Sequence, residues 1–301
     1  MRNRLGKKAL KGLVKRIRTW MEQWEEEERE EFTRRRNFDQ DDFAYPRLNH
    51  LFTKLLREGG GVLRPHYTWG VLQGANLAKA LGICHISVIE FGVAGGNGLL
   101  SLESIAQKVE ALFEMSIDVF GFDTGVGLPK PVDYRDLPNL YAESDFKMDT
   151  EKLTQLLKKA HVVLGPVEDT LVEFINARPA PMAFIAFDLD YYTSTIQAFK
   201  LLETDSALLL PRIHCYFDDI LGFTFSDYTG ERLAIAEFNV SHSERKISPI
   251  YGLRYFLPVP YAHQTWSEAF YLAHVFDHPL YGQNDGLSKP QVGGQFSLRT
   301  Y

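Results

Sequence analysis

The segment from Ser87 to Pro129 constrains the fold of this chain more than any other. An apolar run that ends in an acid, VIEFG, leads into the glycine-rich turn GVAGGNG, a helical stretch and a second apolar run with an acid, DVFGFDTGVGLP. A strand, a glycine-rich turn, a helix and a strand make half of a nucleotide-binding sheet, because glycines let backbone N–H groups and a helix N-terminus approach a ligand. Asp123 follows Gly98 at a spacing close to the ~20 residues expected of an acid that binds ribose hydroxyls. The alternative is a tight turn that binds no ligand.

The glycine spacing of this turn argues against a dinucleotide cofactor. The turn contains Gly92, Gly95, Gly96 and Gly98. Read from Gly92, the dinucleotide fingerprint requires glycine where the chain has Ala94 and Asn97, so NAD and FAD are disfavoured. With Glu90 shortly ahead of the first glycine, the turn resembles the first motif of class I S-adenosylmethionine-dependent methyltransferases.

Composition narrows the class of partner. With 301 residues, 45% hydrophobic and 24% charged, the chain can bury one substantial core. A net charge of -6 argues against a protein that coats nucleic acid, so we expect a small-molecule partner and no nucleic acid. Cys84 and Cys215 lie in apolar runs, without a disulfide framework or metal-ligand spacing, which favours a reducing compartment. No apolar run approaches ~18 residues and no secretory signal is visible, so we expect a cytoplasmic location.

The first 61 residues are expected to form a charged helical extension ahead of a catalytic domain at 62–301, with the glycines of 59–61 as the break. Residues 2–18 carry eight basic side chains and no acid, and the charge reverses at 25–31. One interpretation is a helix that lies on an anionic membrane and makes the protein peripheral there. The other is a solvated arm, or a helix that packs on a partner subunit in a homo-oligomer.

Beyond this break, helical and strand patterns alternate. Helices are predicted at 68–81, 97–114, 150–160, 169–177, 193–204 and 231–238. Strands are predicted at 84–92, 117–123, 161–165, 182–189 and 212–218, with a final antiparallel hairpin from the runs 253–259 and 268–276. The alternation implies an α/β fold with a Rossmann-like, doubly wound and mostly parallel sheet. Such sheets bind ligands at the carboxyl ends of their strands.

Acids follow every parallel strand of this series. They are Glu90, Asp123, Glu168 with Asp169, Asp188 with Asp190, and Asp218 with Asp219. At the third ending, VVLGPVEDT, Glu168 or the neighbouring backbone would contact the amine of an adenine ring. Asp169 would cap the following helix, and the two interpretations are compatible.

The fourth and fifth strand endings predict a metal site. Neighbouring strands lie ~4.8 Å apart, so Asp188 and one or both of Asp218 and Asp219 are expected to reach a single cation. Clustered carboxylates without histidine or cysteine suit Mg²⁺. The alternative is that Asp190 caps the next helix and the Asp218 pair lies in a solvated loop, although unneutralised carboxylates at close range repel each other.

Together these blocks resemble the macrocin O-methyltransferase family of metal-dependent sugar O-methyltransferases. The similar blocks are EFGVAGGNG, GFDTGVGLP, GPVEDTL, FDLDYYTSTIQAF, and FDDI with GERLAIAEF, in the family's order over roughly residues 64–240. The resemblance implies that S-adenosyl-L-methionine is held by Gly92, Gly95 and Asp123. It also implies that Mg²⁺, bound by Asp188, Asp218 and Asp219, engages neighbouring hydroxyls of a sugar. The chain departs from the family at Gly125, Val126 and Leu189.

The expected reaction is methyl transfer from the sulfonium donor to a hydroxyl of a sugar, a glycosylated small molecule or a polysaccharide. Asp188 is the first candidate for the catalytic base, with Asp190, His214 and His263 behind it. His214 lies in the middle of an apolar strand, which is typical of a core histidine.

Three further interpretations stay open at this point. His274, Asp277 and His278 form a cluster that fits a surface turn or substrate loop better than a metal site. A non-catalytic scaffold subunit of a glycan or natural-product assembly would keep the fold without the chemistry, but the strand-end acids argue against it. An NAD-linked oxidoreductase is disfavoured by Ala94 and Asn97.

Overall fold

The computed structural model describes residues 45–59 and 63–283. The predictions about the basic segment 2–18, its membrane contact and its partner subunit fall outside these residues. Within the described ranges, no helix is both long and apolar enough to cross a membrane.

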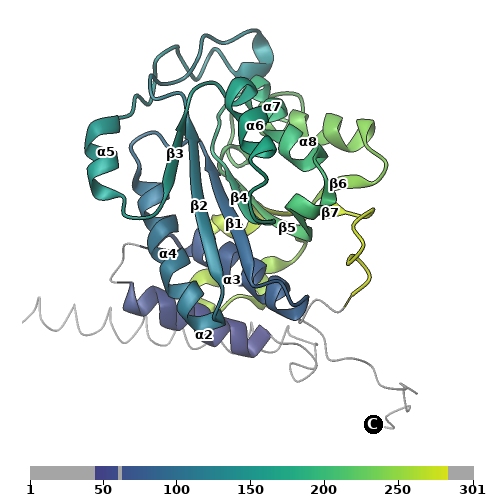
Figure 1. Ribbon diagram of the computed structural model, residues 1–301. Coiled ribbons are helices and arrows are strands. Elements are labelled where there is room, and N and C mark those ends of the chain that lie inside the picture. The colour runs from purple at the N-terminus through teal and green to yellow at the C-terminus, as the bar shows by residue number, and fades with distance from the viewer. Residues whose placement is uncertain (1–44, 60–62, 284–301) are drawn as a thin grey trace, which may run out of the picture.

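A seven-stranded sheet forms the centre of the molecule (Figure 1), in the order β3-β2-β1-β4-β5-β7-β6. The strands are β1 His85–Phe91, β2 Ser116–Asp123, β3 His161–Leu164, β4 Met182–Phe187, β5 Leu209–Phe217, β6 Arg245–Pro249 and β7 Phe270–Val275. The first five are parallel, and β7 runs antiparallel to both β5 and β6. The predicted α/β fold, the Rossmann-like sheet of class I methyltransferases, is therefore confirmed. Its strand order reverses between β1 and β4, where such sheets bind ligands.

Helices cover both faces of this sheet. They are α2 Tyr45–Glu58, α3 Pro65–Ala80, α4 Asn97–Phe113, α5 Thr150–Leu156, α6 Val167–Asn176, α7 Tyr192–Phe199, α8 Gly230–Ser241 and α9 Val259–Ala262. One face carries α3 and α4, with α2 packed outside α3, and the other face carries α6, α7 and α8 (Figure 1). Because both faces are covered, β4 is buried along its whole length, as the run MAFIAF predicts.

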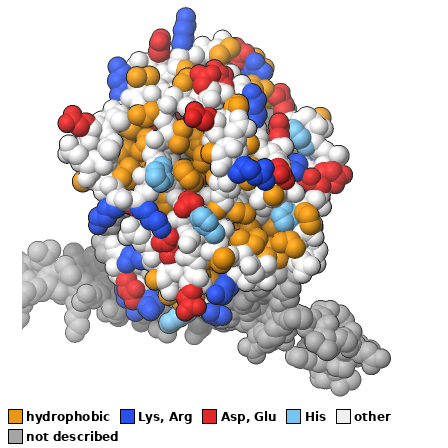
Figure 2. Space-filling model, in the orientation of Figure 1, with side chains coloured by type: hydrophobic (Ala, Val, Ile, Leu, Met, Phe, Trp, Pro, Cys, Tyr) orange, Lys and Arg blue, Asp and Glu red, His pale blue; other side chains and the backbone are white. Residues whose placement is uncertain are grey.

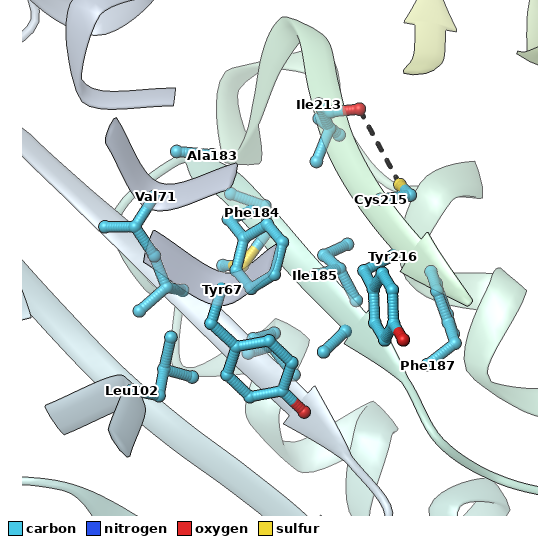
Figure 3. Close-up of a cluster of buried hydrophobic side chains, with 14 of the residues drawn as sticks. Tyr67, Val71, Leu102, Ala183, Phe184, Ile185, Phe187, Ile213, Cys215 and Tyr216 are labelled. Carbon is cyan, nitrogen blue, oxygen red and sulfur yellow. Dashed lines mark hydrogen bonds between the residues drawn. The ribbon is translucent and has the colours of Figure 1, made fainter. Parts of the chain in front are cut away.

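The core beneath the carboxyl edge is aromatic. Tyr67 of α3 packs against Phe184 and Tyr216, with ring centroids 5.6 and 6.1 Å apart. Figure 3 shows the hydroxyls of Tyr67 and Tyr216 pointing the same way, toward the arrowhead ends of the neighbouring strands. The packing of this core therefore delivers two hydroxyl donors to the edge where the strand-end acids lie.

The expected hairpin is only half right. The run 268–276 contains β7, but its partner β6 comes from 245–249, and residues 253–256 form a 3-10 helix instead of a strand. Leu253 and Leu257 are buried as an apolar strand would be. However, Pro258 lacks the N–H group that a ladder needs, so this run contributes buried side chains to the core without joining the sheet.

Helix α2 lies ahead of the domain boundary expected at residues 61 and 62, yet it packs on the domain. Leu48, Phe52 and Leu55 are buried, and the Phe52 ring lies 4.9 Å from the ring of Tyr261. The glycine break therefore does not separate α2 from the core.

On the face shown in Figure 2, basic and acidic side chains are interspersed, with no continuous basic surface.

Candidate active site

A cavity of about 740 Å³ opens at the carboxyl ends of the parallel strands. One part of its wall comes from the glycine turn after β1 and from Asp123 at the end of β2. Another part comes from Asp188, Asp190, Asp218 and Asp219, which follow β4 and β5. The volume falls in the range of about 300–1,000 Å³ that is usual for small-molecule sites.

The glycine turn is shaped by close approach of the backbone. Gly92 has φ +86°, and a Cβ there would lie 1.7 Å from the carbonyl oxygen of Asp188, so the ends of β1 and β4 can meet only at glycine. Ala94 also has a positive φ, +45°. Gly96, with φ +83°, is the N-cap of α4 and provides no side-chain cap, so the first turn of α4 keeps N–H groups for a ligand.

Asp123 faces the glycine turn and holds it. Its Oδ2 accepts the N–H groups of Val93 and Ala94 at 3.0 and 2.8 Å, and its Oδ1 accepts the N–H of Gly125 at 2.6 Å. A carboxylate has about four acceptor positions, so about one is left for a ribose hydroxyl. The sequence predicts that Asp123 contacts the ribose, but it did not indicate the hydrogen bonds by which Asp123 fixes the turn.

Glu90 is buried at the base of the turn, with 1% of its surface exposed. Its Oε1 accepts the Tyr67 hydroxyl at 2.6 Å, and its Oε2 has no hydrogen-bond partner among the described residues. Burial raises the pKa of Glu90 to about 7, although Tyr67 and Arg64 oppose the shift. A Cβ on Gly98 would lie 1.7 Å from this carboxylate, so the fourth glycine of the turn makes room for the acid.

The structure brings Asp188, Asp218 and Asp219 to one region of the cavity. Burial raises the pKa of Asp188 well above its usual range, and the charges of Asp218 and then Asp219 add to the rise. Burial and Asp218 likewise raise the pKa of Asp219 to about 6. The ionisation of Asp188 and Asp219 is hindered by neighbouring carboxylates, and a cation would relieve that repulsion.

The arrangement of these acids is nevertheless not a complete metal site. Within residues 45–59 and 63–283, no three His, Cys, Asp or Glu side chains are grouped so that they could hold a metal ion. Protein donors already occupy two of the acids: Tyr216 donates to Asp218 Oδ1 at 2.8 Å, and Tyr141 donates to Asp219 Oδ1 at 2.9 Å. The donor chemistry therefore fits Mg²⁺, whereas the side-chain positions would have to change to bind it.

Asp190 is the most strained acid of the site. Its φ is +60°, a left-handed conformation that non-glycine residues adopt at a cost, and its N–H donates to Asp219 Oδ2 at 3.1 Å. Burial and the charge of Asp219 raise the pKa of Asp190 to about 8, while the Tyr141 hydroxyl lowers it. The sequence placed Asp190 beside the site but gave no sign of this backbone conformation.

The segment 124–149, between β2 and α5, forms a lid over the cavity, and the sequence did not predict it. Figure 1 shows it above the upper ends of the strands. Asp136, fully buried, fixes the lid to α7 by accepting the N–H and the hydroxyl of Thr193 at 2.9 and 3.0 Å. Tyr141 and Phe146 of the lid line the cavity. The lid places a phenol directly against the acids.

Other predicted residues lie in or out of the cavity as follows. Glu168 lines it at the N-terminus of α6, whereas Asp169 is exposed and does not. His214 is buried against Trp69, outside the cavity, and burial lowers its pKa to about 3. His263 is exposed and also lies outside the lining.

The cluster near the C-terminus of the described chain has structural contacts. Asp277 accepts two hydrogen bonds from Arg245, at 2.8 and 2.9 Å, and Nδ1 of His274 lies 2.8 Å from the Tyr281 hydroxyl. His278 contributes Nδ1 as acceptor for the N–H of Leu280 at 3.0 Å. This agrees with a surface turn.

No protein-family model matches this sequence, and no curated protein matches it. Among solved structures, the chain is similar to CalS11, a calicheamicin methyltransferase, with 19% identity over 69% of this chain and 88% of that chain, at a TM-score of 0.44. An apo structure of CalS11, described as TDP-rhamnose 3'-O-methyltransferase, gives 19% identity over 69% and 89%, at 0.39. The O-methyltransferase NovP gives 14% identity over 59% and 73%, at 0.44.

Proposed function

We propose that this protein is an S-adenosylmethionine-dependent O-methyltransferase that acts on a hydroxyl of a sugar or of a glycosylated acceptor. The observation that carries the proposal is one cavity at the strand-order reversal, bounded by the glycine turn with Asp123 and by four acids after β4 and β5. The first boundary suits a nucleoside donor, and the second suits an acceptor that must lose a proton. CalS11, a TDP-rhamnose 3'-O-methyltransferase, and the O-methyltransferase NovP carry out the same class of reaction.

The donor would lie along the glycine turn. The N-terminus of α4 offers N–H groups, Asp123 offers about one acceptor position to the ribose, and Glu168 lies at the wall where an adenine amine is expected. When bound, S-adenosylmethionine supplies an electrophilic methyl group. NAD is a poorer candidate because Ala94 and Asn97 stand where its fingerprint needs glycine.

Asp190 is our candidate for the catalytic base. The acceptor oxygen would lose its proton to the Asp190 carboxylate and bond to the methyl carbon, and the carbon–sulfur bond of the donor would break with its electron pair going to sulfur. Asp190 lines the cavity, and the bond from its N–H to Asp219 Oδ2 at 3.1 Å holds it beside the acids that would orient the acceptor. The lid would exclude water and hold the acceptor against the acids.

We also propose that Asp188, Asp218 and Asp219 bind Mg²⁺ in the working enzyme. Their carboxylates are the ligand type that this ion prefers, and their mutual repulsion in the free protein supports the proposal. The ion would orient the acceptor hydroxyls and stabilise negative charge on oxygen. The hydrogen bonds from the Tyr141 hydroxyl to Asp219 and from the Tyr216 hydroxyl to Asp218 would then have to break.

The test begins with calorimetric titration of S-adenosylmethionine, followed by mass spectrometry of a panel of glycosides incubated with donor and protein. We expect binding and a mass gain of one methylene in an acceptor, lost in EDTA and restored by Mg²⁺. Asp188→Asn should abolish transfer but leave donor affinity nearly intact. Absence of donor binding would favour the scaffold subunit, nicotinamide binding would favour the oxidoreductase, and full activity in EDTA would remove Mg²⁺ from the proposal.

A further inference from the structure

Glu231, the second residue of α8, is a buried acid without a role in the proposed site. Its side chain is 0% exposed, and it does not belong to the lining of the cavity. Burial raises the pKa of Glu231 well above its usual range, and the charges of Asp219 and Asp188 add to the rise. Acids are seldom fully buried unless an interaction requires them. Glu231 therefore lies behind the acids of the cavity, close enough for their charges to act on it.

The carboxylate of Glu231 holds the backbone of Asp219. Its Oε2 accepts the N–H of Asp219 at 3.1 Å, across 12 positions of the sequence. Asp219 lies in the three-residue 3-10 helix Asp218–Ile220, where its φ of -99° and ψ of 36° depart from helical values. A 3-10 turn of this length has few hydrogen bonds with which to fix its own geometry. The bond from α8 therefore supplies a constraint that the local backbone lacks.

Asp219 in turn holds two other groups of the site. Its Oδ2 accepts the N–H of Asp190 at 3.1 Å, and its Oδ1 accepts the Tyr141 hydroxyl at 2.9 Å. Asp190 has φ +60°, a conformation that persists only where the surrounding contacts enforce it. A movement of the Asp219 backbone would therefore release the main chain of Asp190 and the contact between the lid and the acids.

Stability alone does not account for an acid at position 231. Within residues 45–59 and 63–283, Glu231 Oε1 has no hydrogen-bond partner. A buried carboxylate oxygen without a donor costs free energy. An apolar side chain of similar volume would avoid this cost, but it would leave the Asp219 N–H without its acceptor. The chain therefore keeps a costly acid at a place from which it bonds to Asp219.

We propose that Glu231 is a positioning residue: through the N–H of Asp219 it sets where the Asp219 carboxylate lies, and with it Asp190 and Tyr141. This inference rests on the proposed function, in which Asp190 takes the acceptor proton and Asp219 is a ligand of Mg²⁺. Because Glu231 lies outside the cavity, its effect on methyl transfer passes through Asp219 alone.

The competing interpretation is that Glu231 only stabilises the start of α8. It is the acid of the first turn, and Thr229 provides no side-chain cap, so the helix dipole would favour its negative charge. That role depends on the charge, whereas the proposed role depends on the reach of the acceptor oxygen. Two conservative substitutions separate them, because glutamine keeps the length without the charge and aspartate keeps the charge without the length.

The first experiment compares hydrogen exchange in the ligand-free full chain, in Glu231→Gln and in Glu231→Asp. Mass spectrometry of peptides that contain Asp190 and Asp219 reports on the two N–H groups. The side chain of Glu231→Asp is one methylene shorter and loses the bond to Asp219, so both groups should exchange about tenfold faster or more. Glu231→Gln keeps the acceptor oxygen and should leave both rates nearly unchanged.

Binding and kinetics show whether the position of Asp219 matters for the reaction. In Glu231→Asp, titration calorimetry should show Mg²⁺ binding weakened about tenfold or more, with S-adenosylmethionine binding changed less than about twofold. The kcat of this variant should fall about 10- to 100-fold, whereas Glu231→Gln should retain most of it. A thermal melt confirms that each variant folds. If Glu231→Asp does not fold, Glu231→Gln decides, because loss of transfer there would contradict the inference.

The results that overturn the inference are distinct from failure of the proposed function. If Glu231→Gln loses activity while Glu231→Asp keeps it, the charge at the start of α8 is what matters. If Glu231→Asp weakens donor and Mg²⁺ binding alike, Glu231 is only structural. If its N–H exchange matches that of the unaltered protein, Glu231 does not hold Asp219. An unaltered protein that binds no S-adenosylmethionine would refute the proposed function, whereas the exchange measurement needs no ligand and still tests the positioning.

Discussion

Replacing Glu90 with glutamine should change how the stability of the donor-free protein depends on pH. Burial raises the pKa of Glu90 from 4.5 to about 7 in the folded protein. The folded protein therefore holds this proton more tightly than the unfolded chain does. The stability that the proton contributes is fully present below pH 4.5 and is lost as pH rises to about 7, where both states are ionised.

The size of the effect follows from the shift. At 1.36 kcal/mol for each pKa unit, the interval from 4.5 to about 7 corresponds to about 3 kcal/mol, of which about 2.5 kcal/mol is lost between pH 5 and pH 8. Glu90 is 1% exposed, so solvent screening reduces this little. For a domain of this size, the loss corresponds to roughly 5–10 °C in Tm.

The assay is thermal unfolding of the unaltered protein and of Glu90→Gln at pH 5, 6, 7 and 8, in EDTA and without donor. The Glu90 charge also raises the pKa of Asp188, so the difference in Tm reports the ionisation of Glu90 together with its effect on that neighbour. The Tm of the variant relative to the unaltered protein should increase as pH rises to about 7 and then stay constant. Glu173→Gln, at an exposed position of α6, serves as the control and should give no such trend. A Tm difference for Glu90→Gln that stays constant from pH 5 to pH 8 would refute the reasoning.

Three further substitutions test the site. Asp190→Asn, which tolerates the left-handed backbone, should lower kcat about 10²- to 10⁴-fold with donor affinity unchanged, and normal kcat would exclude Asp190 as the base. Tyr141→Phe removes the lid hydroxyl from the acids and should lower kcat roughly tenfold in steady-state assays, whereas Tyr134→Phe, exposed on the same lid, should not. Gly98→Ala forces a methyl group onto the Glu90 carboxylate. It should cost about 1–3 kcal/mol in denaturant unfolding and weaken donor binding, and an unaffected variant would contradict the close approach.

The hydrogen bonds of the lid and core tyrosines to the acids could not be predicted from the sequence. Tyr141 and Asp219 are 78 positions apart, and nothing in the pattern around Tyr141 indicates that its hydroxyl reaches an acid after β5. Tyr67 and Tyr216 look like core aromatics in the sequence, and their rings are core. The packing of α3 on β4 and β5 directs the Tyr67 hydroxyl to Glu90, 23 positions away, whereas Tyr216 bonds to Asp218 only two positions further along the chain.

The boundaries that were missed have a similar cause. The run 253–259 carries the apolar side chains of a strand, but joining the sheet requires backbone hydrogen bonds, and Pro258 cannot donate one. The strand that pairs with β7 at the edge of the sheet is instead β6, the less apolar segment 245–249. Helix α2 is likewise part of the core, because Phe52 on its buried face packs against Tyr261 and Trp266, far along the chain.

The sequence by itself determined the alternation of strands and helices, the glycine turn and the position of an acid after each parallel strand, because these depend on local periodicity and on residues a few positions apart. The tertiary structure alone decided which of those acids are buried, which tyrosine bonds to each, and that Arg64 stands beside Glu90. Such properties arise where separate segments meet and exclude water, and the energy of a charge depends on that local exclusion more than on its neighbours in the chain.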